Sequence, residues 1–95
     1  MSKGYWMVRA DVTDMDKFKE YASKTPEVLE KFGGQFLARA GKYELVEGNT
    51  RSRNTIIEFP SYQAALDCWH SDDYQSARKI RWGGGDLDIV IVEGI

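Results

Sequence analysis

Several charged residues lie inside segments that have the pattern of β-strands, and four of them can be paired with one another: Arg9, Arg39, Glu58 and Asp88. Arg39 is the clearest case, because it stands between two alanines in "FLARAG". A guanidinium on a face that becomes buried needs a carboxylate, since an unpaired buried charge costs several kcal/mol. Glu58 is the first candidate for that partner.

These four side chains are predicted to form one row across a sheet, in the order Asp88, Arg9, Glu58, Arg39. The row assumes a hairpin that sets Arg39 opposite Glu58, parallel pairing that sets Arg9 beside Glu58, and antiparallel pairing that brings Asp88 near Arg9. In one interpretation the row is a charge-compensated lining that fixes register and pairing in a dimer. In the other, a spare guanidinium binds a carboxylate or enolate ligand, and Glu58 is a base.

A second group of candidates lies in "CWHSDDY", which contains His70, the only histidine. A histidine at the end of a helix is typical of a cation facing the helix dipole, but it could also do acid–base work. Trp69 and Tyr74 could line a pocket between helices and sheet together with Trp6, or they could be simple core. The candidate catalytic residues are therefore Glu58 and His70, and the candidate ligand-binding residues are Arg9, Arg39, Glu58, Trp69, His70 and Tyr74.

Strands and helices must position these side chains, and the hydrophobic periodicity predicts both. The first strand, 5–12, alternates so that Trp6, Val8, Ala10 and Val12 share one face. Thr13 or Asp14 is the expected N-cap of an amphipathic helix whose apolar stripe includes Phe18, Tyr21, Ala22, Thr25 and Leu29. Pro26 predicts two consecutive helical pieces that meet at a bend. Gly33 and Gly34 then end the helix.

The second half of the chain predicts a hairpin, two helices and a last strand. The second strand covers 35–40 and continues past an irregularity at Gly41 through "KYELVE", and the third covers 53–59. Arg51 and Arg53 are interpreted as a solvated turn, so Arg39→Met is expected to destabilise the protein more than Arg51→Met. Ser61 and Ser71 are expected N-caps of the two helices, and the fourth strand follows in "DLDIVIVEG".

The order βαββαβ predicts an α+β, ferredoxin-like fold. Such a fold has a four-stranded antiparallel sheet of order 4-1-3-2 with the helices on one face. Strict alternation sends Phe36, Ala38 and Ala40 toward the helices and Arg39 to the opposite face. That opposite face is half apolar, because it carries Met7, Leu37, Ile56, Val90 and Val92. A homodimer through this open face is expected, since monomers rarely expose such patches.

Composition limits the function classes. The 95 residues are expected to form a single domain, 1–95, and the net charge of −2 gives no general attraction to nucleic acid or membrane lipid. Cys68 is the only cysteine, so no internal disulfide forms, and no metal-ligand spacing is present. The lone thiol fits a reducing cytoplasm, and the start "MSKGYWMVRADV" has no apolar run that would suggest export.

Six segments of the sequence are similar to a known family: "YWMVRADVTD", "YASKTPEVLEKFGGQFLARAG", "VEG", "IIEFPSYQAAL", "DDYQSAR" and "DIVIVEG". With this spacing the chain resembles the domain of unknown function 1330 family, within the dimeric α/β-barrel superfamily. The resemblance implies a ferredoxin-like protomer that pairs its bare sheet face with a second copy, as in relatives that include monooxygenases, muconolactone isomerases and haem-handling enzymes. No reaction follows from it, because one fold hosts many chemistries.

Haem chemistry is not expected. The resemblance implies that haem-degrading relatives use an asparagine on the first strand, with a tryptophan and a histidine on the second helix. The first strand here has no asparagine, and Trp69 and His70 are adjacent, about 100° apart on a helix. We therefore expect no cofactor, and two functions stay open: a small-molecule binder or enzyme acting on anionic or aromatic compounds, and a non-catalytic dimeric module whose buried charges serve assembly.

Overall fold

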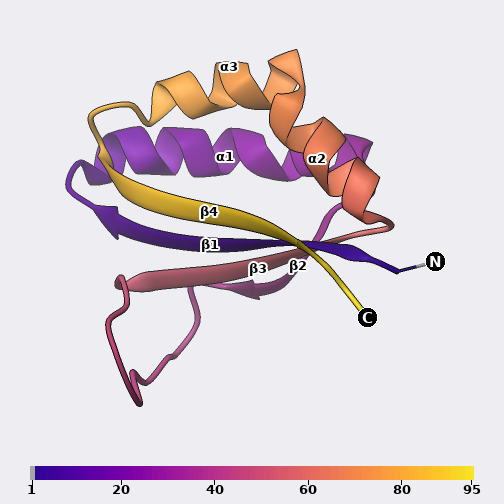
Figure 1. Ribbon diagram of the computed structural model, residues 1–95. Helices are drawn as coiled ribbons and strands as arrows, with labels where there is room; N and C mark the ends of the chain where they lie inside the picture. Colours follow the sequence, from indigo (N-terminus) through magenta and orange to yellow (C-terminus); the bar gives the residue numbers. More distant parts are fainter. Residues whose placement is uncertain (1) are drawn as a thin grey trace.

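The computed structural model describes residues 2–95 and confirms the α+β, ferredoxin-like order. Along the chain the elements are β1 (Gly4–Val12), α1 (Met15–Lys31), β2 (Gln35–Arg39), β3 (Arg53–Phe59), α2 (Tyr62–His70), α3 (Asp72–Ile80) and β4 (Gly85–Glu93). The helices form one layer over one face of the sheet, and the other face carries none (Figure 1). We call the uncovered side the open face. None of the helices within residues 2–95 has the length and apolar composition needed to cross a membrane.

The sheet has the expected order, β2-β3-β1-β4, so β2 and β4 are its edge strands. All neighbouring strands are antiparallel. The parallel pairing assumed for the first and third strands is therefore wrong. Arg9 lies opposite Asn54 of β3, whereas Glu58 lies opposite Tyr5. The expected register between Arg9 and Asp88 of β4 is confirmed.

The predicted caps begin the helices. Asp14 caps α1 by accepting from two backbone N–H groups of its first turn. Ser61 caps α2, and Ser71 caps α3 in the same way. Gly33 has φ +78°, a conformation that favours glycine, and follows the end of α1.

Pro26 lies inside α1, which continues through it as one helix where the sequence predicts two pieces. Proline has no backbone N–H, so the carbonyl of Ala22, four residues earlier, loses its helical donor. The hydroxyl of Thr25 donates to that carbonyl at 3.3 Å. A second donor comes from β2 and is part of the site described below.

β2 departs from the predicted alternation. Phe36 pairs with Ile57, whereas Ala38 pairs with Ile56, so the register shifts between them through a β-bulge. Ile57 is buried on the helix side, and Ile56 is 41% exposed on the open face. Ala38 therefore belongs to the open face, and Arg39 turns to the helix-covered face. The prediction that Arg39 faces a partner subunit is wrong for this reason.

Residues 40–52, which we call the arm, do not continue the second strand as "KYELVE" predicts. Ala40 has φ +51° and turns the chain out of the sheet. Every residue from 41 to 50 is exposed. The arm projects away from the helix layer before the chain returns to β3 (Figure 1).

The core lies between the sheet and the helices and is built mainly of aromatic rings. Trp6 is 1% exposed, and its indole Nε1 donates to the Ala65 carbonyl at 3.0 Å. Its ring lies 5.3 Å from Phe59, 4.9 Å from Tyr74 and 6.0 Å from Trp69. These contacts join β1, β3 and both short helices, so the aromatic cluster fixes α2 and α3 over the sheet.

Candidate ligand-binding site

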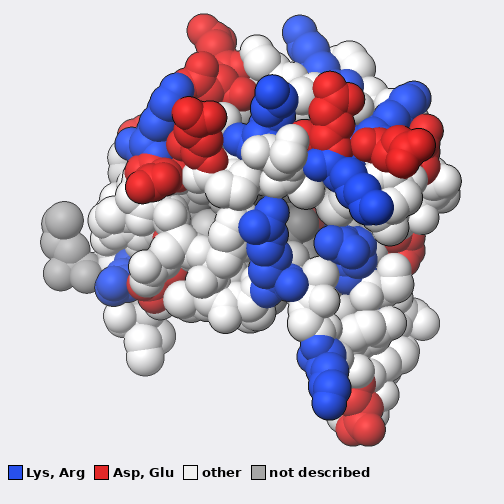
Figure 2. Space-filling view, turned by 180° about the vertical axis from the view of Figure 1, so that it is seen from behind, with Lys and Arg blue, Asp and Glu red and all other residues white. Residues whose placement is uncertain are grey.

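A cavity of about 60 Å³ lies between α1 and the helix-covered face of the sheet. We call it the helix-side cavity. Most of its lining is aromatic or aliphatic, from Trp6, Phe18, Leu29, Phe36 and Ile57. Arg39 and Arg53 also line it, and no aspartate or glutamate among residues 2–95 does. The back of the molecule shows basic side chains on both sides of a hollow beneath the helix layer (Figure 2).

Arg39 is held at this cavity by the backbone of α1. Its Nη2 donates to the Ala22 carbonyl at 3.1 Å, which is the carbonyl that Pro26 leaves without a helical donor. Its guanidinium carbon lies 4.3 Å from the centre of the Phe36 ring. Arg39 forms no ion pair within residues 2–95. The remaining N–H groups of this exposed guanidinium are therefore free to meet an anion.

Arg53 is the second basic residue of the cavity. It lies opposite Ala10 of β1, a residue that is 2% exposed, so it belongs to the helix-covered face. Its guanidinium carbon lies 4.9 Å from the centre of the Phe18 ring. It too forms no ion pair within the described chain. The interpretation of Arg53 as part of a solvated turn is wrong.

Two tyrosine hydroxyls meet beside the same cavity. Tyr21 Oη lies 2.7 Å from Tyr74 Oη, and either oxygen could be the donor. Tyr21 is 8% exposed and Tyr74 is 0% exposed, and both line the cavity. Burial, and then the neighbouring Tyr74 hydroxyl, raise the pKa of Tyr21, so it keeps its proton.

The predicted row of four charges does not form. Glu58 lies on the open face and accepts from Lys3 Nζ at 3.1 Å, Tyr5 Oη at 3.2 Å and Gln35 Nε2 at 3.3 Å. The Lys3 ammonium is the main cause that lowers the pKa of the Glu58 carboxyl. A carboxylate held in its charged form by three donors is a poor base. Glu58 and Arg39 lie on opposite faces of the sheet, so they cannot form the expected pair.

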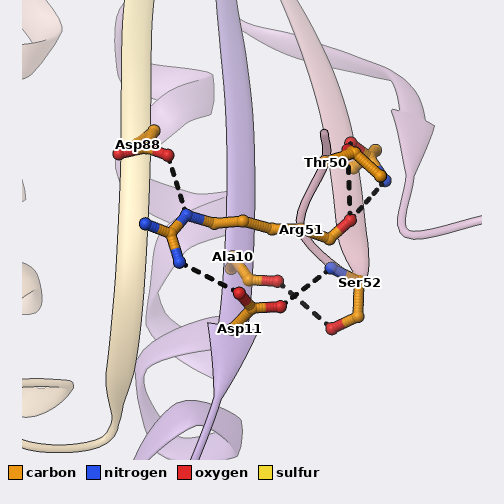
Figure 3. A network of polar contacts seen from close by, with 7 residues as sticks. Ala10, Asp11, Thr50, Arg51, Ser52 and Asp88 are labelled. Atoms are coloured by element: carbon orange, nitrogen blue, oxygen red, sulfur yellow. Dashed lines mark hydrogen bonds and ion pairs between the residues drawn. The ribbon is translucent and has the colours of Figure 1, made fainter. Parts of the chain in front are cut away.

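The carboxylate of Asp88 binds a different arginine from the one predicted. Arg51 reaches across β1, where its Nε lies 2.7 Å from Asp88 Oδ2 and its Nη1 lies 2.9 Å from Asp11 Oδ2 (Figure 3). The backbone N–H of Ser52 donates to the other oxygen of Asp11 at 2.9 Å. The hydrogen bond from the Ser52 N–H lowers the pKa of the Asp11 carboxyl most, and the Arg51 guanidinium lowers it further. Arg9 lies opposite Asp88 but makes no ion pair within residues 2–95.

The candidates in "CWHSDDY" separate in the structure. Tyr74 lines the helix-side cavity together with Trp6, but Trp69 and His70 are not among its lining residues. Trp69 packs 5.2 Å from Tyr74 and lies beneath Arg78. His70 is exposed in the last turn of α2. The expected pocket of Trp69, His70 and Tyr74 is therefore not formed by this group.

Sequence reasoning could have found one of the missed residues. Arg53 has the same parity as Thr55, Ile57 and Phe59, which alternation assigns to the helix side. Its place in the cavity follows from the third strand once that strand begins at Arg53. The hydroxyl contact of Tyr21 depends on how α1 meets α3, which periodicity does not describe. Among residues 2–95, no group of three histidine, cysteine or acidic side chains is arranged to hold a metal ion.

Comparison with protein families gives one match over nearly the whole chain. The family described as "Domain of unknown function (DUF1330)" matches residues 3–95. No functionally curated protein matches the chain.

Solved structures share the fold at low sequence identity. A protein of unknown function from Rhodopseudomonas palustris has a TM-score of 0.79 at 16% identity, covering 99% of this chain and 83% of that one. A protein from Nitrosomonas europaea, provisionally named an antibiotic biosynthesis monooxygenase, has a TM-score of 0.60 at 17% identity, covering 98% and 90%. A protein from Bacteroides thetaiotaomicron, named as a candidate oxidoreductase, has a TM-score of 0.55 at 13% identity, covering 97% of each chain. At these identities the likeness shows the ferredoxin-like fold alone.

Proposed function

The chain belongs to the domain of unknown function 1330 family, and from that premise we propose that it is a homodimer that binds small organic anions in the helix-side cavity. The observation that carries the proposal is the pair of arginines, Arg39 and Arg53, in a lining that contains no carboxylate within the described residues. A guanidinium without a counter-ion beside apolar surface favours an anion, because the anion restores neutrality and accepts directed hydrogen bonds.

The apolar lining supports an organic anion rather than a bare inorganic ion. Trp6, Phe18 and Phe36 present hydrocarbon surface to the cavity. Ligand sites of this kind combine an apolar wall with a few polar groups that fix orientation. We assign the carboxylate end of the ligand to the arginines and its carbon skeleton to the space beneath α1. The names of the Nitrosomonas europaea and Bacteroides thetaiotaomicron proteins make oxidation of the bound anion the finer form of the proposal. The family resemblance adds isomerisation as the alternative reaction.

The open face supports the dimer. Its apolar side chains are 40–57% exposed in the single chain: Met7, Leu37, Ile56, Val90 and Val92. A folded monomer of 10.9 kDa is expected to expose about 5,600 Å². This chain exposes 6227 Å². Part of the excess comes from the exposed arm, and the apolar patch is the part that a second copy would cover with its own matching face.

Calorimetric titration of short aliphatic carboxylates, benzoate and their uncharged amides tests the anion site. We expect the carboxylates to bind more tightly than the amides. The double variant Arg39→Gln/Arg53→Gln should weaken carboxylate binding by roughly tenfold to a hundredfold, because each arginine supplies charge-assisted hydrogen bonds.

Lys42→Gln controls for a general effect of charge, because it removes a positive charge from the exposed arm and Lys42 does not line the cavity. It should leave carboxylate binding unchanged. If the wild-type protein binds none of the carboxylates, the proposed anion site is wrong. It is also wrong if Lys42→Gln lowers the carboxylate affinity as much as the double variant does.

The second candidate function is the non-catalytic assembly module. It is favoured by the ion-pair network of Arg51 with Asp11 and Asp88, which lies on the same face as the apolar patch. Under this alternative the open face and its charges serve dimerisation, and the cavity stays without a ligand. A dimer that binds no anion in the titrations supports it.

A further inference from the structure

One hydroxyl proton of the Tyr21–Tyr74 pair, beside the helix-side cavity, has no hydrogen-bond acceptor among residues 2–95. Tyr21 and Tyr74 each carry one hydroxyl proton, and one of these protons fills the 2.7 Å contact between the two oxygens. The second proton has no acceptor in the hydrogen bonds formed by residues 2–95. This holds whichever tyrosine is the donor in the mutual contact.

A spare donor at this position is costly unless something accepts from it. Tyr74 is 0% exposed and Tyr21 is 8% exposed, so bulk water does not reach the pair freely. Buried hydroxyls are almost always satisfied, because an unmet donor loses its full hydration free energy. Both tyrosines line the cavity, so a ligand bound in it can supply the missing acceptor.

We propose that the Tyr21–Tyr74 pair donates a hydrogen bond to an oxygen at the buried end of the ligand. The inference rests on the proposed anion site and narrows its substrate class. The ligand is a short oxo-carboxylate, with its carboxylate at Arg39 and Arg53 and a carbonyl oxygen at the tyrosines.

The size of the cavity limits the carbon chain between the two groups. A cavity needs at least about 10 to 15 Å³ to hold one water. The 60 Å³ beneath α1 is only a few times that minimum. That space suits a chain of a few carbons, whereas a fused aromatic system is too large for it.

The pair also has a property that one tyrosine lacks. The direction of the hydrogen bond between the hydroxyls can reverse, so the spare proton can be on Tyr21 or on Tyr74. The donor therefore adapts to a carbonyl nearer α1 or nearer α3. When one hydroxyl is removed, the other tyrosine keeps its proton. That proton is no longer used in a hydrogen bond between the two rings, so it can still be donated to the ligand.

Matched ligands test the inference. Titrations compare 4-oxopentanoate with 4-methylpent-4-enoate, and 5-oxohexanoate with 5-methylhex-5-enoate, so that a methylene group replaces the carbonyl oxygen at nearly constant shape. The wild-type protein should bind the oxo member of a pair about fivefold to tenfold more tightly, as expected for one net hydrogen bond.

Three variants keep the rings and remove the hydroxyls: Tyr21→Phe, Tyr74→Phe and the double variant. Each single variant should keep a preference for the oxo ligand, since one proton remains. The double variant should bind both members of a pair equally and should still prefer carboxylates to amides through the arginines. Circular dichroism melting of all three proteins checks that they fold.

The possible failures can be told apart. If the carboxylates bind but the two members of each pair bind equally to the wild-type protein, the tyrosine inference is wrong and the anion site stands. A preference that survives in the double variant overturns it as well. If none of these carboxylates binds, the anion site and the inference built on it both fail.

Discussion

Arginine side chains on the two faces of the sheet make different contacts. On the open face, Arg51 contacts two carboxylates, those of Asp11 and Asp88. On the helix-covered face, Arg39 and Arg53 contact aromatic rings and a backbone carbonyl, with no carboxylate among residues 2–95. A compensated guanidinium serves the protein's own structure, whereas an uncompensated one keeps its capacity for a ligand. Arg9 also lies on the open face and makes no ion pair within residues 2–95, so the contrast is between Arg51 and the cavity pair Arg39 and Arg53.

The largest expected effect is the loss of dimerisation through the open face. Ile56→Lys places a charge in the middle of the apolar patch, where the dimer would bury it without a partner. Burial of an unpaired charge costs about 3 to 5 kcal/mol, so the dimer dissociation constant should rise by at least about a hundredfold. Analytical ultracentrifugation over a range of concentrations measures this.

Met15→Lys is the matched control for that variant, because Met15 is 46% exposed on the helix layer. It should sediment like the wild-type protein. A wild-type chain that stays monomeric at micromolar concentration would show that the open face does not pair with a second copy.

The next prediction compares the stability lost when Arg51, which forms ion pairs, or Arg39, which forms none within residues 2–95, is replaced. Arg51→Met removes two ion pairs and leaves Asp11 and Asp88 without their cation. It should lower the melting temperature by roughly 5 °C. Arg39→Met should lower it by less than roughly 2 °C, because Thr25 still donates to the Ala22 carbonyl. This ranking is the reverse of the one predicted from the sequence.

Thermal unfolding of both variants, at one protein concentration and low salt, provides the measurement. High salt should shrink the Arg51→Met effect, since the ion pairs are partly exposed. Equal melting temperatures for the two variants would mean that compensation on the open face contributes no stability.

The smallest effect concerns pH and again belongs to the open face. The Ser52 N–H and then Arg51 lower the folded-state pKa of Asp11 below its unfolded value of about 3.9. A lowered pKa gives stability that is fully present above the unfolded pKa and is lost as the pH falls through the folded one. Asp11→Asn should therefore lose stability less steeply than the wild-type protein between roughly pH 5 and 2.

Denaturation midpoints at several pH values test this, with Asp67→Asn as a control on the exposed side of α2. The control should follow the wild-type curve. Parallel curves for the wild-type and Asp11→Asn proteins would mean that the Asp11 contacts do not persist in solution.

Most of the fold follows from periodicity, and so do Arg53, Trp6 and Tyr74 in the cavity lining, but the position of Arg39 does not. Alternation places the side chains of β1, β3 and β4 correctly, because those strands pair without interruption. β2 contains a bulge that one extra residue creates, and no pattern in "QFLARA" marks it. That single shift moves Arg39 to the other face and removes the predicted partner Glu58. The contact of Arg39 with Ala22 also needs the gap left by Pro26, which only the three-dimensional arrangement reveals.

The unequal edges of the sheet have a consequence for aggregation. β2 is five residues long, carries the bulge and ends at a residue with φ +51°, so it presents a poor template for another strand. β4 is nine residues long, regular and rich in branched apolar side chains, "GDLDIVIVE", and its outer hydrogen-bonding groups form the second edge. Two of its acidic residues, Asp86 and Glu93, make no ion pair within residues 2–95, and they repel an identical strand beside it. When Asp86→Asn and Glu93→Gln remove these charges, chains should join edge to edge through β4 first, and fibrils of that variant should contain this strand in their protected core.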